Sequence, residues 1–269
     1  MTKAFGHCAA RILGGAVLLG QIAAGPLSAR TAEEIMRQWD RNGAFRNEVA
    51  VVAMTLVNKN GRERVRKFKR LVRSRDDGFR NILIEFLAPT DIAGTKLLTL
   101  ERPTGSDDQF FYLPALKQVR RMLAGNDRDR FMGSDFTFGD LKTEKFDRYE
   151  YRNPGLEQVG ERTAYKIVAT PRDSRTVRQS GYSKRVFWVD TVTYADLKRE
   201  YYGKSGQLEK SATFENIKPV EGLEEPMHRP RKIVLVDHKR NHTTILETEE
   251  IRADKTLDPN MFTRKYLMR

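Results

Sequence analysis

Apolar residues recur along most of the chain in short runs that have the period of β-strands. Residues 47–58 are rich in valine and have little polarity on either face, which predicts a strand covered on both sides. Residues 162–170 alternate between apolar and polar positions. Similar runs follow at close spacing as far as residues 243–251, separated by turn signals such as Asn60-Gly61. Together they predict one large antiparallel sheet of about eleven strands, curled or closed.

Three segments need a separate interpretation. Thr31 and Glu34 form a capping box ahead of an apolar face, which predicts one short helix that ends at Asn42-Gly43. Residues 62–73 fit a helix period as well as a strand period, and the turn before them favours a strand. Residues 123–150 are polar and contain glycine, so we expect a loop and a short helix against an open face of the sheet.

The first residues have the three parts of a secretory signal peptide. A basic segment with Lys3 and Arg11 precedes an apolar run over 12–24, and small residues follow. The run is shorter than the roughly 20 residues that a transmembrane helix needs, which argues against the alternative of a retained anchor. We expect residues 1–29 to be removed after Gly25 or Ala29. Residues 30–269 would then form a single domain in the periplasm.

Charge and cysteine content indicate the kind of partner and the compartment of the protein. The net charge is +13, and it stays strongly positive when the signal peptide is removed. This charge suits an anionic partner such as lipid headgroups, including peripheral contact with a membrane, or simply a solvated basic surface. Export argues against nucleic acid. The only cysteine is Cys8, so the mature chain would have no thiol, which suits an oxidising compartment.

Sequence motifs for catalysis are missing. The chain has no nucleophile elbow, phosphate loop or dinucleotide fingerprint, so we predict no catalytic residue and no cofactor. His238 and His242 flank one predicted hairpin turn, and His228 lies in the proline-rich approach to the same strand. The three could hold a metal with Asp237. They lack the helical spacing of a metal-binding pair, which favours ordinary surface histidines and no metal.

The densest unusual stretch lies between residues 110 and 141. An apolar, aromatic strand is followed by a basic strand, and then by a loop that contains glycines and three phenylalanines. Two interpretations are open. The phenylalanines could plug a hydrophobic groove while Arg120 and Arg121 meet an anionic headgroup or loop carbonyls. Alternatively, the aromatic residues lie in the core and the arginines pair with Asp127, Asp129 or Asp135.

This stretch resembles the outer-membrane lipoprotein-sorting protein family, in the branch similar to the lipoprotein carrier LolA. The resemblance spans residues 31–269. It rests on these segments: Tyr112-Leu113-Pro114, Lys117-x-x-Arg120-Arg121, Phe131-Met132-Gly133-Ser134-Asp135-Phe136-Thr137 with Asp140-Leu141, Phe187-Trp188-Val189-Asp190, and Leu257-Asp258-Pro259-Asn260-Met261-Phe262-Thr263.

The resemblance implies a mainly β fold, namely a curved, incomplete antiparallel β-barrel of about eleven strands whose mouth is closed by helices. Its concave apolar face would receive acyl chains. We take ten aromatic, apolar and basic residues as candidate ligand contacts, nine from the stretch between residues 110 and 141 and one from the segment at 187–190: Phe110, Tyr112, Leu113, Arg120, Arg121, Phe131, Met132, Phe136, Phe138 and Trp188.

The implied function is a monomeric, non-enzymatic periplasmic carrier of lipid or lipoprotein acyl chains that works with an RND-type inner-membrane transporter. One alternative function is that of a sensing module, which binds envelope lipid or protein and regulates a membrane partner. A second rival is a periplasmic hydrolase, which would need titratable groups that converge in a cavity.

Overall fold

The computed structural model describes residues 1, 30–43, 47–123, 127–223, 227–253 and 256–269. The predicted signal peptide and both of its cleavage points lie outside the described residues, apart from Met1. Residues 31–269 form one compact unit. Within the described ranges, no helix is long and apolar enough to cross a membrane.

One 13-stranded antiparallel sheet dominates this unit. Its strands are β1 (Asn47–Val57), β2 (Glu63–Ser74), β3 (Arg80–Ala88), β4 (Lys96–Leu100), β5 (Asp108–Leu113), β6 (Gln118–Met122), β7 (Tyr149–Val159), β8 (Arg162–Pro171), β9 (Lys184–Asp190), β10 (Asp196–Tyr202), β11 (Leu208–Pro219), β12 (His228–Asp237) and β13 (His242–Ala253). The helices are α1 (Ala32–Gly43), α2 (Ser174–Ser180) and α3 (Arg264–Leu267), with short 3₁₀ turns η1 (Pro114–Leu116), η3 (Phe131–Gly133), η4 (Phe146–Arg148) and η5 (Pro259–Phe262).

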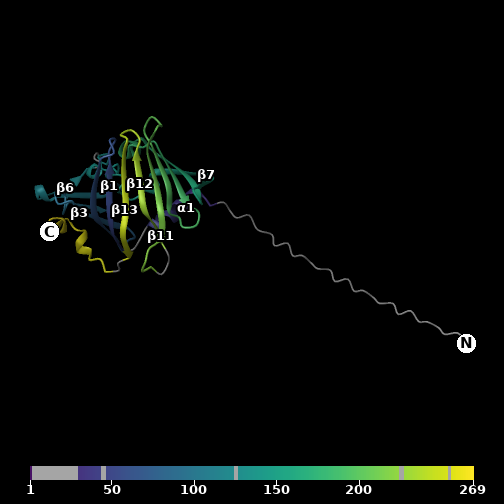
Figure 1. The fold of residues 1–269 in the computed structure, drawn as a ribbon, viewed down its shortest axis with the longest axis horizontal. Helices are drawn as coiled ribbons and strands as arrows, with labels where there is room; N and C mark the ends of the chain where they lie inside the picture. The colour runs from purple at the N-terminus through teal and green to yellow at the C-terminus, as the bar shows by residue number, and fades with distance from the viewer. Residues whose placement is uncertain (2–29, 44–46, 124–126, 224–226, 254–255) are drawn as a thin grey trace. The chain divides into compact units, whose positions relative to one another are not determined.

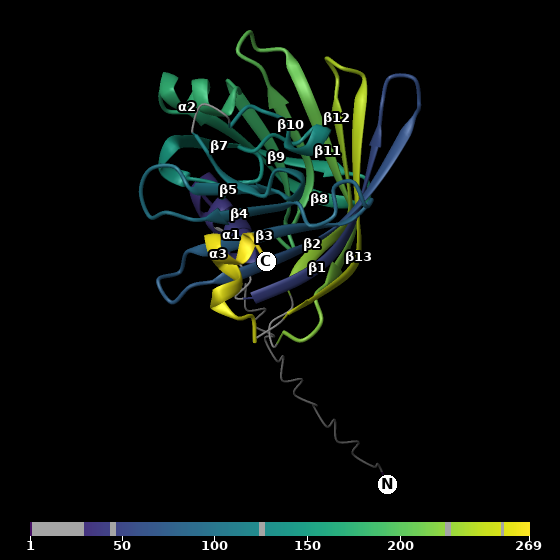
Figure 2. The ribbon, with the colours of Figure 1, turned by 90° about the vertical axis from the view of Figure 1, so that its left-hand side faces the viewer.

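The order of the strands is β6-β5-β4-β3-β2-β1-β13-β12-β11-β10-β9-β8-β7. The first and last strands therefore pair in the middle of the sheet, where β1, β13 and β12 lie side by side (Figure 1). The sheet is strongly curved (Figure 2) and stays open, with β6 at one edge and β7 at the other. The predicted class, a mainly β protein with a curved antiparallel sheet, is confirmed.

The strand count of about eleven is wrong. The strand without a counterpart among the predicted runs is β7, which contains Asn153-Pro154-Gly155. Its pairing with β8 shifts register between Arg152 and Gly155, and Gly155 has a φ of 135°. Proline and glycine in a strand mark a bulge here, whereas in the sequence they resemble a turn. The ambiguous residues 62–73 form strand β2, as predicted.

Helix α1 begins with the predicted capping box. The Thr31 backbone N–H donates to Glu34 Oε2 at 2.8 Å, and the Glu34 N–H donates to Thr31 Oγ1 at 3.2 Å. Ile35 and Met36 are fully buried against the concave side of β7–β9. Helix α3 instead packs with Phe262 on the convex face of β2–β5, against Leu71, Leu83 and Leu98. Among the helices of the described residues, none is seen to close the mouth of the sheet.

Candidate functional site

The floor of the site is built from alternate residues of the central strands. Val52 of β1 pairs with Phe68 of β2 on one side and with Thr248 of β13 on the other. Ile233 of β12 lies between Phe214 of β11 and Leu246 of β13 in register. Because strand residues alternate between faces, these side chains share the concave side of the sheet. The pattern therefore places an apolar surface at the centre of the concave face.

The segment between β6 and β7 crosses this face and fills one end of it. Phe131 and Phe138 contact one another edge to face and join a buried cluster with Phe86, Leu97 and residues of β1. These two rings therefore lie in the core, at one end of the concave face. Residues 131–138 are called the plug below.

The buried carboxylate of Asp135 connects this segment to β13 through hydrogen bonds. Asp135 has no exposed surface and accepts hydrogen bonds from His242 Nδ1 at 2.7 Å, Thr244 Oγ1 at 2.7 Å and Arg240 at 3.3 Å. In the other direction, the Asp135 backbone N–H donates to Thr244 Oγ1 at 2.9 Å. A buried charge needs such a complete set of partners to be tolerated. The prediction of a surface histidine is therefore wrong for His242, which is only 4% exposed.

Beyond the plugged end, the concave face encloses a cavity of about 390 Å³. This volume lies within the range of roughly 300–1,000 Å³ that is typical of small-molecule sites. Helix α1 and residues 140–144 border it opposite the sheet. Most of the apolar part of its lining comes from six strands: Ala50, Val52, Phe68, Val72, Ile82, Ile84, Phe214, Ile233, Leu246 and Ile251.

Charged residues gather where this floor ends, towards α1. Glu48 is almost completely buried and is bonded to Arg70, while Arg229 Nε lies 3.6 Å from its second carboxylate oxygen. Arg80 bridges Asp40 of α1 at 3.0 Å and Glu101 at 3.2 Å. Burial, together with the guanidinium groups of Arg70 and Arg80, lowers the pKa of Arg229 to about 10, and Glu48 offsets this only in part.

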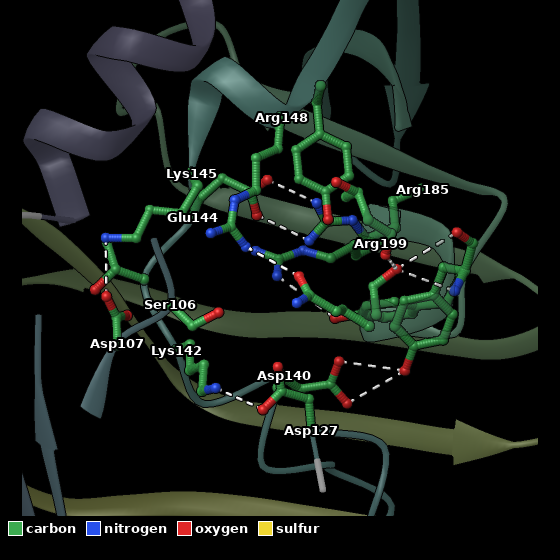
Figure 3. A pocket seen from close by; sticks show the side chains of 18 of the residues that line it. Ser106, Asp107, Asp127, Asp140, Lys142, Glu144, Lys145, Arg148, Arg185 and Arg199 are labelled. Atoms are coloured by element: carbon green, nitrogen blue, oxygen red, sulfur yellow. Dashed lines mark hydrogen bonds and ion pairs between the residues drawn. The ribbon is translucent and has the colours of Figure 1, made fainter. Parts of the chain in front are cut away.

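A second, smaller pocket of about 150 Å³ also has side chains of residues 140–144 in its lining (Figure 3). It is polar and most of its charged side chains form ion pairs. Arg185 forms a bidentate ion pair with Glu144, at 2.6 and 2.8 Å, and Lys142 pairs with Asp127. The Tyr182 hydroxyl donates to Asp140, and burial, with Asp140 adding to it, raises the pKa of this tyrosine. These groups hold the segment in place around the cavity.

The ten candidate ligand contacts are divided between the two faces of the sheet. Phe131, Met132, Phe136 and Phe138 lie with the plug on the concave side, and Phe136 packs in one cluster with Phe214, a lining residue. Phe110, Tyr112 and Trp188 lie in clusters on the convex side. The lining of the large cavity contains none of the ten.

The remaining three candidates belong to the edge of the sheet. Leu113 ends β5 and is half-buried, and Arg120 is exposed on β6. Arg121 pairs with an aspartate, as the second interpretation expected. Its partner is Asp108, however, and not Asp127, Asp129 or Asp135. Whether any of the ten contacts a ligand stays a prediction.

Sequence reasoning missed the residues that line the cavity. Ala50, Ile233 and Leu246 are unremarkable members of their strands, and Arg70 and Arg229 are two of many basic residues. Only the register of β1, β2, β12 and β13 shows that their side chains share one face of the sheet. Among the described residues, no group of histidine, cysteine or acidic side chains is arranged to hold a metal ion.

Comparisons with known proteins agree with this architecture. A family model described as “Uncharacterized protein” matches residues 78–269. A Vibrio parahaemolyticus domain named as a putative outer membrane lipoprotein-sorting protein domain is 28% identical, with a TM-score of 0.80 over 89% of this chain and 98% of its own. A DUF1329 family protein from Desulfovibrio piger is 25% identical, with a TM-score of 0.81 over 89% of this chain and all of its own.

A LolA superfamily protein from Nitrosomonas europaea shares the fold at 20% identity, with a TM-score of 0.67 over 88% of this chain and all of its own. No curated protein matches the sequence significantly. The resemblance carried by the motifs at residues 112–141 is therefore confirmed over nearly the whole compact unit. The chain belongs to the DUF1329 family, and its fold is similar to those of the solved proteins named for outer membrane lipoprotein sorting and for the LolA superfamily.

Proposed function

We propose that the protein is a carrier that binds an acyl chain of a lipid or lipoprotein in the concave cavity and catalyses no reaction. The observation that supports this most directly is the apolar floor of a 390 Å³ cavity in a sheet that stays open at both edges. The solved relatives named for lipoprotein sorting and the LolA superfamily point in the same direction.

The energetics of such binding need no reactive group. Burying an acyl chain gains about 0.8 kcal/mol for each CH₂, so a long chain gains on the order of 10 kcal/mol before entropic costs. The charged groups around the cavity form ion pairs with one another, which is the arrangement of a structural wall rather than of converging acids and bases. Release then requires a better acceptor for the chain or a movement of the wall.

The setting that fits this role is the periplasm. We propose that residues 1–29 are a signal peptide removed after Gly25 or Ala29, and that residues 30–269 work there as one monomeric domain. We further propose an RND-type inner-membrane transporter as the partner that supplies or receives the cargo. This partner rests on the family resemblance alone.

Purification of the protein from its own periplasm, followed by native mass spectrometry and lipid extraction, tests the proposal. A carrier shows one bound acyl species that exchanges with added lipid vesicles. A protein that contains no lipid and takes up none from vesicles is not a carrier. A stable complex with a membrane protein, without lipid exchange, would favour the sensing module instead.

A further inference from the structure

Strand β6 forms one edge of the sheet and pairs with β5 on its inner side (Figure 1). An antiparallel edge strand pairs through alternate residues, so the N–H and C=O groups of the other residues point outward. Over the ranges that the structure describes, no strand, isolated bridge or further backbone hydrogen bond occupies this outer side. The edge is therefore able to accept one more strand.

The opposite edge, β7, is protected against such pairing. Pro154 has no N–H to donate, and Gly155 forms the bulge at which the register with β8 shifts. The guanidinium of Arg172 also donates to the backbone carbonyl of Tyr149. Prolines and bulges are common means of keeping an edge strand from pairing with another chain. β6 contains neither proline nor glycine, so the two edges differ in their availability to a partner.

Positive charge lies on both faces of the β6 edge. Arg120 is exposed and pairs across the strands with Phe111, whose ring meets Phe138 on the concave side. Arg121 pairs with Phe110 of the convex face, and its side chain is 64% exposed. A strand added beside β6 would therefore meet a guanidinium group on each of its faces.

The β5–β6 hairpin has too few acids to balance its cations. Its single acid, Asp108, is shared between Arg121 and a second arginine that precedes the hairpin. Arg120 and Lys117 form no ion pair with a described residue. Residues 124–126, which come next in the sequence, contain no charged side chain. The hairpin therefore favours an acidic partner.

The surroundings of β6 define the chemistry of a strand that would fit there. Leu116 is 47% exposed just before β6, and Leu123 is 65% exposed just after it. Acidic residues at the centre of the added strand and an apolar residue at each end would match these features. A second copy of β6 would not match, because it would bring arginines next to arginines, and like charges across strands are destabilising.

We propose that β6 is a docking edge for a protein partner, which adds one extended, acidic segment to the sheet as a further strand. Main-chain hydrogen bonds supply the affinity in this mode of recognition, and the arginines select acidic side chains. The inference goes beyond acyl-chain binding and does not depend on it, because the described lining of the large cavity contains no residue of β6.

Fluorescence anisotropy of labelled synthetic peptides, titrated with the full chain, tests the charge preference of this docking edge. The acidic probe alternates glutamate and valine between terminal leucines, and a second probe has lysine in place of each glutamate. We expect saturable binding of the acidic probe and at least tenfold weaker binding of the lysine probe.

Two N-methylated forms of the acidic probe test the main-chain hydrogen bonds. One is methylated at alternate residues and the other at the remaining residues. Successive N–H groups of a strand point to opposite sides, so only one of the two patterns blocks pairing with β6. One form should therefore lose binding while the other keeps it.

Two variants separate a charge effect at the edge from a general one. Arg120→Glu reverses the charge at the centre of β6 and should weaken the acidic probe about tenfold, which corresponds to about 1.4 kcal/mol. Arg152→Glu is the matched control, because Arg152 is an exposed arginine on the other edge strand, and it should leave binding unchanged. Calorimetric titration with the uncharged lipid monopalmitoyl glycerol should give one affinity for the wild type and Arg120→Glu.

The docking edge is refuted if the acidic probe does not bind, if the acidic and lysine probes bind equally, or if N-methylation affects the two acidic forms alike. Equal weakening by Arg120→Glu and Arg152→Glu would refute it as well. A dimer of the full chain in light scattering that Arg120→Glu dissociates would show that a second copy occupies the edge instead. The lipid titration alone decides acyl-chain binding, so the two proposals can fail separately.

Discussion

A charge placed on the cavity floor offers the sharpest test of acyl-chain binding. Ile233 lies at the centre of the floor, and its direct neighbours across the strands are Phe214 and Leu246, both apolar. An aspartate there would stay hydrated while the cavity is empty. A bound acyl chain would cover it, and neither of these two neighbours carries a charge that could pair with it.

The expected magnitude follows from this geometry. Burying an unpaired carboxylate costs several kcal/mol even after the surroundings relax. Since 1.4 kcal/mol is a tenfold change, Ile233→Asp should raise the Kd for monopalmitoyl glycerol by about a hundredfold or more. The neutral ligand is used so that repulsion between ligand and carboxylate does not contribute.

Val234→Asp is the matched control, because Val234 is also half-buried, lies one residue along β12 and points to the convex face beside Ile245 and Thr213. Thermal unfolding of both variants shows whether they are folded to the same degree. Equal affinities for Ile233→Asp and Val234→Asp would refute the assignment of the concave floor as the acyl site.

Three other predictions concern the plug and a hydrogen bond of Tyr202. Phe136→Asp should weaken acyl binding in the same titration without unfolding the protein, since Phe136 packs in one cluster with the lining residue Phe214; unchanged binding would exclude it as a contact. Asp135→Asn should weaken the hydrogen bonds from His242 and Arg240, lower the free energy of unfolding in urea by about 1–3 kcal/mol, and speed hydrogen exchange over residues 131–138; exchange at the wild-type rate would show that Asp135 does not hold the plug. The hydrogen bond to Glu200 raises the pKa of Tyr202 to about 12 from 10.0, so the folded state keeps this proton between those values and stability falls as pH rises through them. Tyr202→Phe should remove one tyrosinate that titrates near pH 12 in ultraviolet difference spectra, and a variant titration identical to that of the wild type would contradict the assignment.

The fold is largely predictable because its strands carry period-two patterns and are separated by clear turns. The capping box at Thr31 and the strand over residues 62–73 are also predictable, and the structure confirms both. β7 is not, because Pro154 and Gly155 form a bulge within the strand that cannot be told from a turn without the pairing partner β8. Local signals therefore suffice for elements whose pairing is regular.

The site is much less predictable, because it depends on which face each strand residue occupies. Phe110 and Phe111 are neighbours in the sequence, yet Phe110 packs on the convex face while Phe111 meets Phe138 in the plug. A shift of one residue in register exchanges the two faces. Trp188 lies on the convex face for the same reason. The arginines at Glu48 are equally hard to find, since β2 alone contributes basic residues to both faces.

The pairing of β1 with β13 has a consequence for how the binding surface comes into being. Ala50 and Val52 supply one half of the floor, and Leu246 and Ile251 supply the neighbouring half from the far end of the polypeptide. The contacts between them have high sequence separation, and such contacts form slowly. A chain that is still being synthesised lacks this pairing and therefore has no complete concave floor. For the proposed carrier, this means that only a molecule that has finished folding takes up cargo, so that incomplete chains do not capture lipid.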